Sequence, residues 1–191
     1  MRTIRTKVYQ FSELSKQVQQ TAIEWYKGIL NNDADILQGF EDYCKEEAEK
    51  QGFNDIKIQY SFSYSQGDGL SFSCKNFNIK KFLTENTRLH KDSVINTLSN
   101  KLTVEINGNN SRYCYASRSD IDLYLDANKD YPNIQSIIPS LLTDLEDKYL
   151  TLCKELENIG YKWLEAAFED ESIIANIEAN EYEFTIDGNR F

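Results

Sequence analysis

Few residues in this sequence have the types and spacing that catalysis or metal binding requires. His90 is the one histidine, so neither a serine–histidine–aspartate triad nor a site with several histidine ligands can be built around it. The four cysteines contain no C-x-x-C pair, which fits neither a zinc knuckle nor a redox motif; they are Cys44, Cys74, Cys114 and Cys153. We therefore expect no catalysis, no cofactor and no metal, and interpret the cysteines as free, mostly buried thiols in a reducing compartment.

Three aspartates in the middle of the chain are the weak candidates for a metal site. Asp120, Asp122 and Asp126 alternate with apolar residues and fall on one face of a predicted strand, where carboxylate oxygens could hold a hard cation. Their spacing lacks the glycine and the terminal glutamate of a calcium loop. The solvated face of a strand is therefore the favoured interpretation of this pattern.

The segment Gln66-Gly67-Asp68-Gly69 resembles a phosphate-binding loop in composition only. It lies between two alternating patterns instead of between a strand and a helix, and no lysine follows it. A tight turn explains the glycines, because a reversal with positive φ angles favours them. The alternative hypothesis is a contact site for a ligand or partner, made by Tyr64, Gln66, Asp68 and Phe72.

Negative charge is concentrated in the last quarter of the chain. Residues 144 to 191 contain 13 Asp/Glu and 4 Lys/Arg, and the whole chain has a net charge of −10. A field of this sign repels nucleic acid, so direct binding to DNA or RNA is not expected. A basic protein surface is the more plausible partner.

The same residues define a hypothetical acidic interaction surface, which comprises Glu155, Glu165, Glu169, Asp170 and Glu171. One interpretation is the ordinary solvated face of an amphipathic helix. The functional alternative is a surface that imitates the charge of a nucleic acid or docks on a basic groove of another protein, where charge complementarity would speed association.

Hydrophobic periodicity predicts where the helices and strands lie. It predicts strands at residues 3–11, 56–65, 70–74, 102–106, 113–115, 121–125 and 181–186, and helices at 14–29, 36–48, 79–83, 94–98, 141–167 and 173–177, the longest of them bent at Gly160. The short links between strands favour antiparallel pairing. The expected fold is therefore α+β, with an antiparallel sheet of about four to six strands packed against an N-terminal helical hairpin and a long C-terminal helix.

Length and composition predict one soluble domain that spans residues 1–191. The 22.2 kDa chain is 40% hydrophobic, which is enough side-chain area to offset the entropy of ordering it. The first residues lack the apolar core of a signal peptide, and no segment approaches the roughly 18 to 20 apolar residues that span a bilayer. We expect a cytoplasmic protein with no membrane contact.

Three segments together resemble a family of small proteins encoded by bacteriophages and prophages: VYQFSELSKQVQQTAIEWYKG, YSFSYSQGDGLSFSC and ANEYEFTIDGNRF. The family has an S-Q-G-D-G hairpin motif and an N-x-Y-x-F-T-x-D-G C-terminal segment. The matching positions are Ser65, Gln66, Gly67, Asp68, Gly69 and Phe72 in the hairpin, and Asn180, Tyr182, Phe184, Thr185, Asp187 and Gly188 near the end. Tyr64 stands where relatives often have tryptophan, a departure that keeps an aromatic ring.

The resemblance implies a phage or mobile-element accessory protein in the cytoplasm of an infected bacterial host. Accessory proteins of that origin commonly bind host defence machinery, so the expected function is inhibition of a host defence protein (anti-CRISPR or another anti-defence type) through an acidic surface, without catalysis. Some relatives are labelled antitoxin, which gives the first alternative, a partner that neutralises a toxin by direct binding. The second alternative is a small-ligand or metal-binding protein that uses the Gln66–Gly69 loop.

Overall fold

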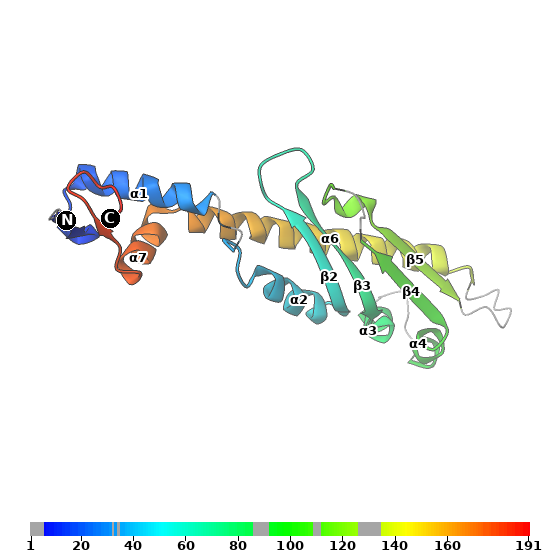
Figure 1. The fold of residues 1–191 in the computed structure, drawn as a ribbon. Helices are drawn as coiled ribbons and strands as arrows, with labels where there is room; N and C mark the ends of the chain where they lie inside the picture. The colour runs from blue at the N-terminus through cyan, green and yellow to red at the C-terminus, as the bar shows by residue number, and fades with distance from the viewer. Residues whose placement is uncertain (1–5, 32, 34, 86–91, 109–111, 126–134) are drawn as a thin grey trace, which may run out of the picture. The chain divides into compact units, whose positions relative to one another are not determined.

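The computed structural model describes residues 6–31, 33, 35–85, 92–108, 112–125 and 135–191; His90 and Asp126 lie outside them. The fold is α+β, as predicted (Figure 1). Its contacts divide into two compact units. Met1–Gln38 and Tyr161–Phe191 form one, here called the terminal unit, and Gly39–Gly160 form the other, the sheet unit. The expectation of a single domain stays a prediction.

The sheet unit contains a four-stranded antiparallel sheet in the order β2-β3-β4-β5. The strands are β2 (Phe53–Ser61), β3 (Gly69–Phe77), β4 (Leu102–Asn107) and β5 (Asp120–Leu125). The predicted hairpin is confirmed as β2 and β3, which pair continuously from Phe53↔Phe77 to Ser61↔Gly69. Its alternation of apolar and polar residues fixes this register, because a slip by one residue would turn the apolar side chains to solvent.

The long helix α6 (Ile138–Ala167) packs its buried stripe on one face of this sheet (Figure 1). The buried side chains recur every three or four residues: Leu141, Leu145, Tyr149, Leu152 and Leu156. The helix is continuous through Gly160, and the expected bend at this residue stays a prediction. A Cβ at Gly160 would overlap the ring of Phe62 and lie 2.9 Å from that of Phe40, so this glycine permits close packing.

Tyr149 makes an unusual link between α6 and the sheet. Its hydroxyl accepts a hydrogen bond from the backbone N–H of Phe72 (3.0 Å) and donates one to the carbonyl of the same residue (2.8 Å). Ser119 Oγ lies 2.8 Å away. Burial raises the pKa of the Tyr149 phenol, so the group stays neutral and able to donate.

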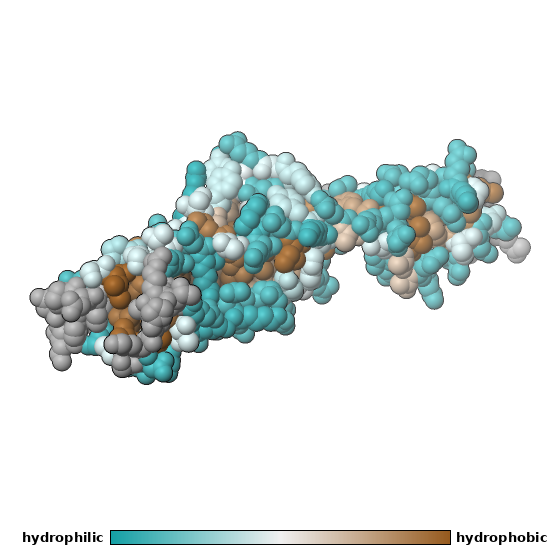
Figure 2. All heavy atoms as spheres, turned by 180° about the vertical axis from the view of Figure 1, so that it is seen from behind, coloured by the Kyte–Doolittle hydropathy of each residue, from teal (hydrophilic) through white to brown (hydrophobic). Residues whose placement is uncertain are grey.

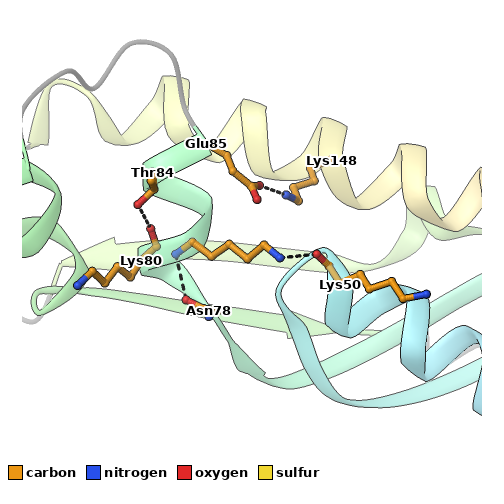
Figure 3. Close-up of polar contacts among 7 residues, drawn as sticks. Lys50, Asn78, Lys80, Thr84, Glu85 and Lys148 are labelled. Carbon is orange, nitrogen blue, oxygen red and sulfur yellow. Dashed lines mark hydrogen bonds and ion pairs between the residues drawn. The ribbon is translucent and has the colours of Figure 1, made fainter.

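Shorter helices complete the sheet unit: α2 (Phe40–Lys50), α3 (Ile79–Glu85) and α4 (Asp92–Ser99). Polar contacts hold α3 between its neighbours (Figure 3): the Nζ of Lys81 donates to the Lys50 carbonyl at the end of α2, and Glu85 pairs with Lys148 of α6 at 2.7 Å. The amine thereby satisfies one of the carbonyls that a helix C-terminus leaves without a partner.

Residues 113–115 form no strand, contrary to the alternation. The rings of Tyr113 and Tyr115 stack on one another, with centroids 5.7 Å apart, and Arg118 lies over both. Cys114, between them, is buried, and its N–H donates to the Gly67 carbonyl at 2.9 Å. The segment therefore crosses the β2–β3 turn instead of extending the sheet.

The terminal unit joins the two ends of the chain. It contains β1 (Tyr9–Gln10), the 3-10 helix η1 (Phe11–Glu13), α1 (Lys16–Leu30), residues 161–167 of α6, α7 (Asp170–Ala179) and β6 (Glu183–Phe184). β1 and β6 pair antiparallel. Its buried core comprises Phe11, Leu14, Ala22, Ile23, Leu30, Ile173, Ile177 and Phe184. Both predicted N-terminal helices are present, α1 in this unit and α2 in the sheet unit.

Candidate functional site

The acidic residues of the terminal unit are exposed, as an interaction surface requires. All eight acidic side chains between residues 161 and 191 are exposed, and only Lys162 and Arg190 offer positive charge in this segment. The eight are Glu165, Glu169, Asp170, Glu171, Glu178, Glu181, Glu183 and Asp187. Glu155 is also exposed, but it belongs to the sheet unit. Four of the five predicted surface residues thus share one unit.

The start of α7 explains locally why three of these carboxylates are adjacent. Glu169 is the N-cap residue, and Asp170 and Glu171 lie in the first turn. Carboxylates are favourable there because the N-terminus of a helix carries partial positive charge. Asp170 also pairs with Lys27 of α1 at 2.9 Å, and this hydrogen bond raises the pKa of Lys27. Part of the acidic pattern therefore stabilises the unit itself.

Residues 183–191 form a small hairpin that presents two apolar side chains to solvent. Its turn is closed by hydrogen bonds from Gly188 N–H to the Thr185 carbonyl and from Thr185 N–H to the Asn189 carbonyl. Gly188 has φ +81°, and a Cβ there would lie 2.8 Å from the Val18 carbonyl of α1. The turn is thus packed against α1, while Ile186 is 66% exposed and Phe191 67% exposed.

An aromatic cluster packs against this hairpin. The ring of Trp25 meets those of Tyr182 and Phe184 edge-on, with centroids 5.4 and 5.7 Å away. The guanidinium of Arg190 lies over Trp25 and Tyr182, a cation–π arrangement. The hairpin that carries Ile186 and Phe191 therefore rests on packed aromatic side chains. In Figure 2 this unit, at the right of the view, has a mostly hydrophilic surface with a few hydrophobic residues.

Sequence reasoning missed Ile186 and Phe191 as candidate contact residues. Ile186 follows Tyr182 and Phe184 at strand spacing, which predicted a side chain packed like theirs. The Asp187-Gly188 pair could have indicated that Ile186 is exposed, because a turn at that point ends the strand alternation and exposes the residue before it. Nothing in the sequence distinguished Phe191 from a core aromatic.

The aspartate of the β2–β3 turn makes hydrogen bonds within the turn itself. The carboxylate of Asp68 accepts hydrogen bonds from Ser61 Oγ (2.8 Å), Ser63 Oγ (3.0 Å) and the Ser65 backbone N–H (3.0 Å). Gly67 has φ +106° and lies so close to the Tyr113 ring that a Cβ would overlap it. The S-Q-G-D-G motif is thereby accounted for as a turn that docks on residues 113–115.

The other predicted contact residues of this hairpin differ in exposure. Phe72 is fully buried and packs on Tyr149, with ring centroids 4.7 Å apart, so it belongs to the core and offers no surface. Gln66 is exposed, and Tyr64 is 68% exposed with φ +55°. The hypothesis of a partner contact stays a prediction for Tyr64, Gln66 and Asp68.

The weak metal candidates lie on the face of the sheet away from α6. Asp120 and Asp122 alternate along β5 with Ile121 and Leu123, and Asp122 pairs with Glu105 of β4. Within the described part of the chain, no group of three or more His, Cys, Asp or Glu side chains could hold a metal ion. These carboxylates therefore fit a solvated strand face.

The cysteines are free and buried, as predicted. Burial raises the pKa of Cys44 and that of Cys153 to about 12. A thiol is nucleophilic only as the thiolate, so both groups are poor nucleophiles at neutral pH. Of the helices that the structure describes, none combines the length and apolar composition needed to cross a membrane.

Comparison with known protein families gives a match over most of the chain. Residues 25–172 match the family described as "Domain of unknown function (DUF8835)". The matched region includes the sheet unit and the S-Q-G-D-G hairpin but stops before the C-terminal hairpin. No curated protein and no solved structure matches the chain.

Proposed function

We propose, for a chain that belongs to the family of the DUF8835 domain, that it acts as a non-catalytic binding protein whose acidic surface docks on a basic surface of another protein. The observation that carries the proposal is the exposure of all eight acidic side chains in residues 161–191, against two basic ones. Charge complementarity of this kind sets association rate and partner choice.

The exposed apolar side chains can supply the binding affinity that surface charge alone does not provide. Rim charges contribute little affinity, whereas a few large buried side chains dominate most interfaces. Ile186 and Phe191 lie within the acidic segment, on a hairpin anchored by Gly188 and the Trp25 cluster. They are, with Ile29 and Trp163, exposed apolar side chains of the terminal unit that a partner could bury, and the carboxylates of this segment would form the polar rim.

The resemblance to phage proteins supports the choice of partner. We propose that the target is a host defence protein whose function depends on a basic surface, such as one that holds nucleic acid, and that the protein blocks it without chemistry. An acidic surface fits such a groove because the groove is built for phosphates. Neutralisation of a toxin by the same surface is the alternative outcome.

Affinity capture with matched charge variants tests this proposal. The acid variant, Glu165→Gln/Glu169→Gln/Glu171→Gln, removes three charges from the terminal unit and spares the Asp170–Lys27 pair. The control, Glu41→Gln/Glu46→Gln/Glu49→Gln, removes three exposed charges from α2 in the sheet unit. Net charge is equal in the two variants, so only the location of the charge differs.

We expect the wild type and the control to capture the same defence protein from a bacterial host and to protect phage in infection assays, while the acid variant captures less of that protein and protects phage less. A captured toxin and rescue of growth on co-expression would select the antitoxin alternative. Capture that is equal for the two variants, or no specific capture by the wild type, contradicts the proposal.

A further inference from the structure

A polar cavity opens on the face of the sheet away from α6, beside the end of β4. Its volume is about 230 Å³, and its walls are Lys57, Ile58, Gln59, Ser71, Phe72, Ser73, Asn107 and Gly108. Lys57, Ser71 and Ser73 alternate along their strands with buried apolar residues, which places them on this outer face. The cavity lies wholly within the sheet unit.

The cavity lies beside the end of the β3–β4 pairing. The two strands pair at Cys74↔Ile106, and continuation of that register would place Phe72 opposite Gly108. The backbone groups of Phe72 instead bond to the Tyr149 hydroxyl. A Cβ on Gly108 would lie 3.0 Å from the Ser73 nitrogen, so glycine is what allows the backbones to approach beside the opening.

One wall residue has an unmet hydrogen-bonding requirement. Ser71 is fully buried, and its hydroxyl has no hydrogen-bond partner among the residues that the structure describes. Buried hydroxyls nearly always have a partner, because removal from water without compensation is unfavourable. A group that occupies the cavity would supply the missing bond.

The chemistry of the walls selects the kind of group. Lys57 is the one ionisable residue among the walls and carries positive charge, while the other polar side chains, those of Ser71, Ser73, Gln59 and Asn107, all contain hydrogen-bond donors. This lining is positive in a chain whose net charge is −10. Several donors around one ammonium suit an anion with several acceptor oxygens.

We propose that this cavity binds a phosphate group, either inorganic phosphate or the phosphate of a small phosphomonoester. Lys57 would neutralise the charge, and the hydroxyls of Ser71 and Ser73 with the amide of Asn107 would donate to the oxygens. The volume is below the range of about 300–1,000 Å³ typical of sites for drug-sized ligands, which favours a small ligand. This site is separate from the acidic surface of the terminal unit.

The test is a titration of the ¹⁵N-labelled full chain with sodium phosphate and, separately, with glycerol 3-phosphate, at constant ionic strength. The proposal predicts saturable shifts of the Ser71, Ser73 and Gly108 amides. Lys57→Gln should weaken binding about tenfold or more, since a charge-assisted contact is lost. Lys75→Gln, an exposed lysine of β3 outside the cavity walls, should leave it unchanged. The ligand that binds more tightly identifies the source of the phosphate.

Ser71→Ala provides a second readout that does not depend on NMR assignment. In phosphate-free buffer the variant should melt at or above the wild-type temperature, because a buried hydroxyl without a partner is removed. In phosphate the wild type should gain in melting temperature, and the variant should gain less. No saturable shifts, shifts that Lys57→Gln and Lys75→Gln alter equally, or an equal thermal gain in the wild type and Ser71→Ala would overturn the proposal.

Discussion

Replacement of Tyr149 by phenylalanine isolates one hydrogen-bonding group in the core of the sheet unit. The ring would keep its contacts with Phe72 and Phe53, whose centroids lie 4.7 and 6.3 Å away. Only the hydroxyl disappears, and with it the partner of the Phe72 N–H and carbonyl. The variant therefore measures how much the hydrogen bonds to the Phe72 backbone contribute to stability, with the packing of the ring unchanged.

The expected cost follows from the two groups left without a partner. A buried donor or acceptor that loses its partner costs about 1–3 kcal/mol, so loss of both partners in Tyr149→Phe should lower the free energy of unfolding by about 2–6 kcal/mol. The matched control is Tyr124→Phe, because the Tyr124 ring is 42% exposed and its hydroxyl donates to Glu105 at the surface. Such a surface change should stay within about 0.5 kcal/mol.

Urea denaturation of the two variants and the wild type provides the measurement, with the midpoint compared at equal slope. Hydrogen exchange of the Phe72 amide should accelerate in Tyr149→Phe, because its acceptor is gone. If Tyr149→Phe were as stable as Tyr124→Phe, the inference that the phenol replaces a strand partner at Phe72 would be refuted.

The pH dependence of stability gives an independent check on the same group. Burial raises the pKa of Tyr149 above its ordinary value of 10.0, so the unfolded chain ionises there first. The stability linked to this protonation is fully present below pH 10 and is lost as the pH rises above 10. The difference in stability between the wild type and Tyr149→Phe should therefore shrink above pH 10, and a constant difference would contradict the assigned environment.

Three further changes test other parts of the structure. Asp68→Ala should cost about 1–2 kcal/mol in urea denaturation, because the carboxylate accepts hydrogen bonds from three serines; no loss would show that the turn forms without it. Gly160→Ala should destabilise by about 1–3 kcal/mol despite the better helix propensity of alanine, because the Cβ would overlap the ring of Phe62; a stabilised variant would contradict this packing. Cys44 and Cys153, whose pKa is raised to about 12, should react with a thiol reagent at pH 7.5 far more slowly in the native protein than in urea; equal rates would contradict their burial.

Local pattern was sufficient to predict the β2–β3 hairpin and the long helix. Ile56, Ile58 and Tyr60 alternate with polar residues, and two glycines follow at the reversal, so strand, turn and register come from neighbours in sequence. The stripe on α6 is likewise a local repeat. The same helical pattern of polar and apolar residues predicted the exposure of Glu165, Glu169 and Glu171.

Features that depend on residues far apart in sequence were not predictable. Tyr113 and Tyr115 alternate like strand residues, yet stacking under Arg118 and the bond to Gly67 hold them outside the sheet. Ser71 lies among polar residues along β3 that resemble a solvated face, yet it is fully buried. The Tyr149 hydroxyl that bonds to the backbone of the next residue, Phe72, lies 77 residues away along the chain.

The most direct test of the central claim, that the acidic surface of the terminal unit binds the partner, is the affinity for the captured defence protein as a function of salt. Three exposed charge contacts of about 0.5 kcal/mol each together correspond to about tenfold in affinity. The Glu165→Gln/Glu169→Gln/Glu171→Gln variant should bind about tenfold more weakly at low salt and show a shallower salt dependence, while the α2 control should match the wild type. Equal affinity and equal salt dependence for the two variants would contradict the claim.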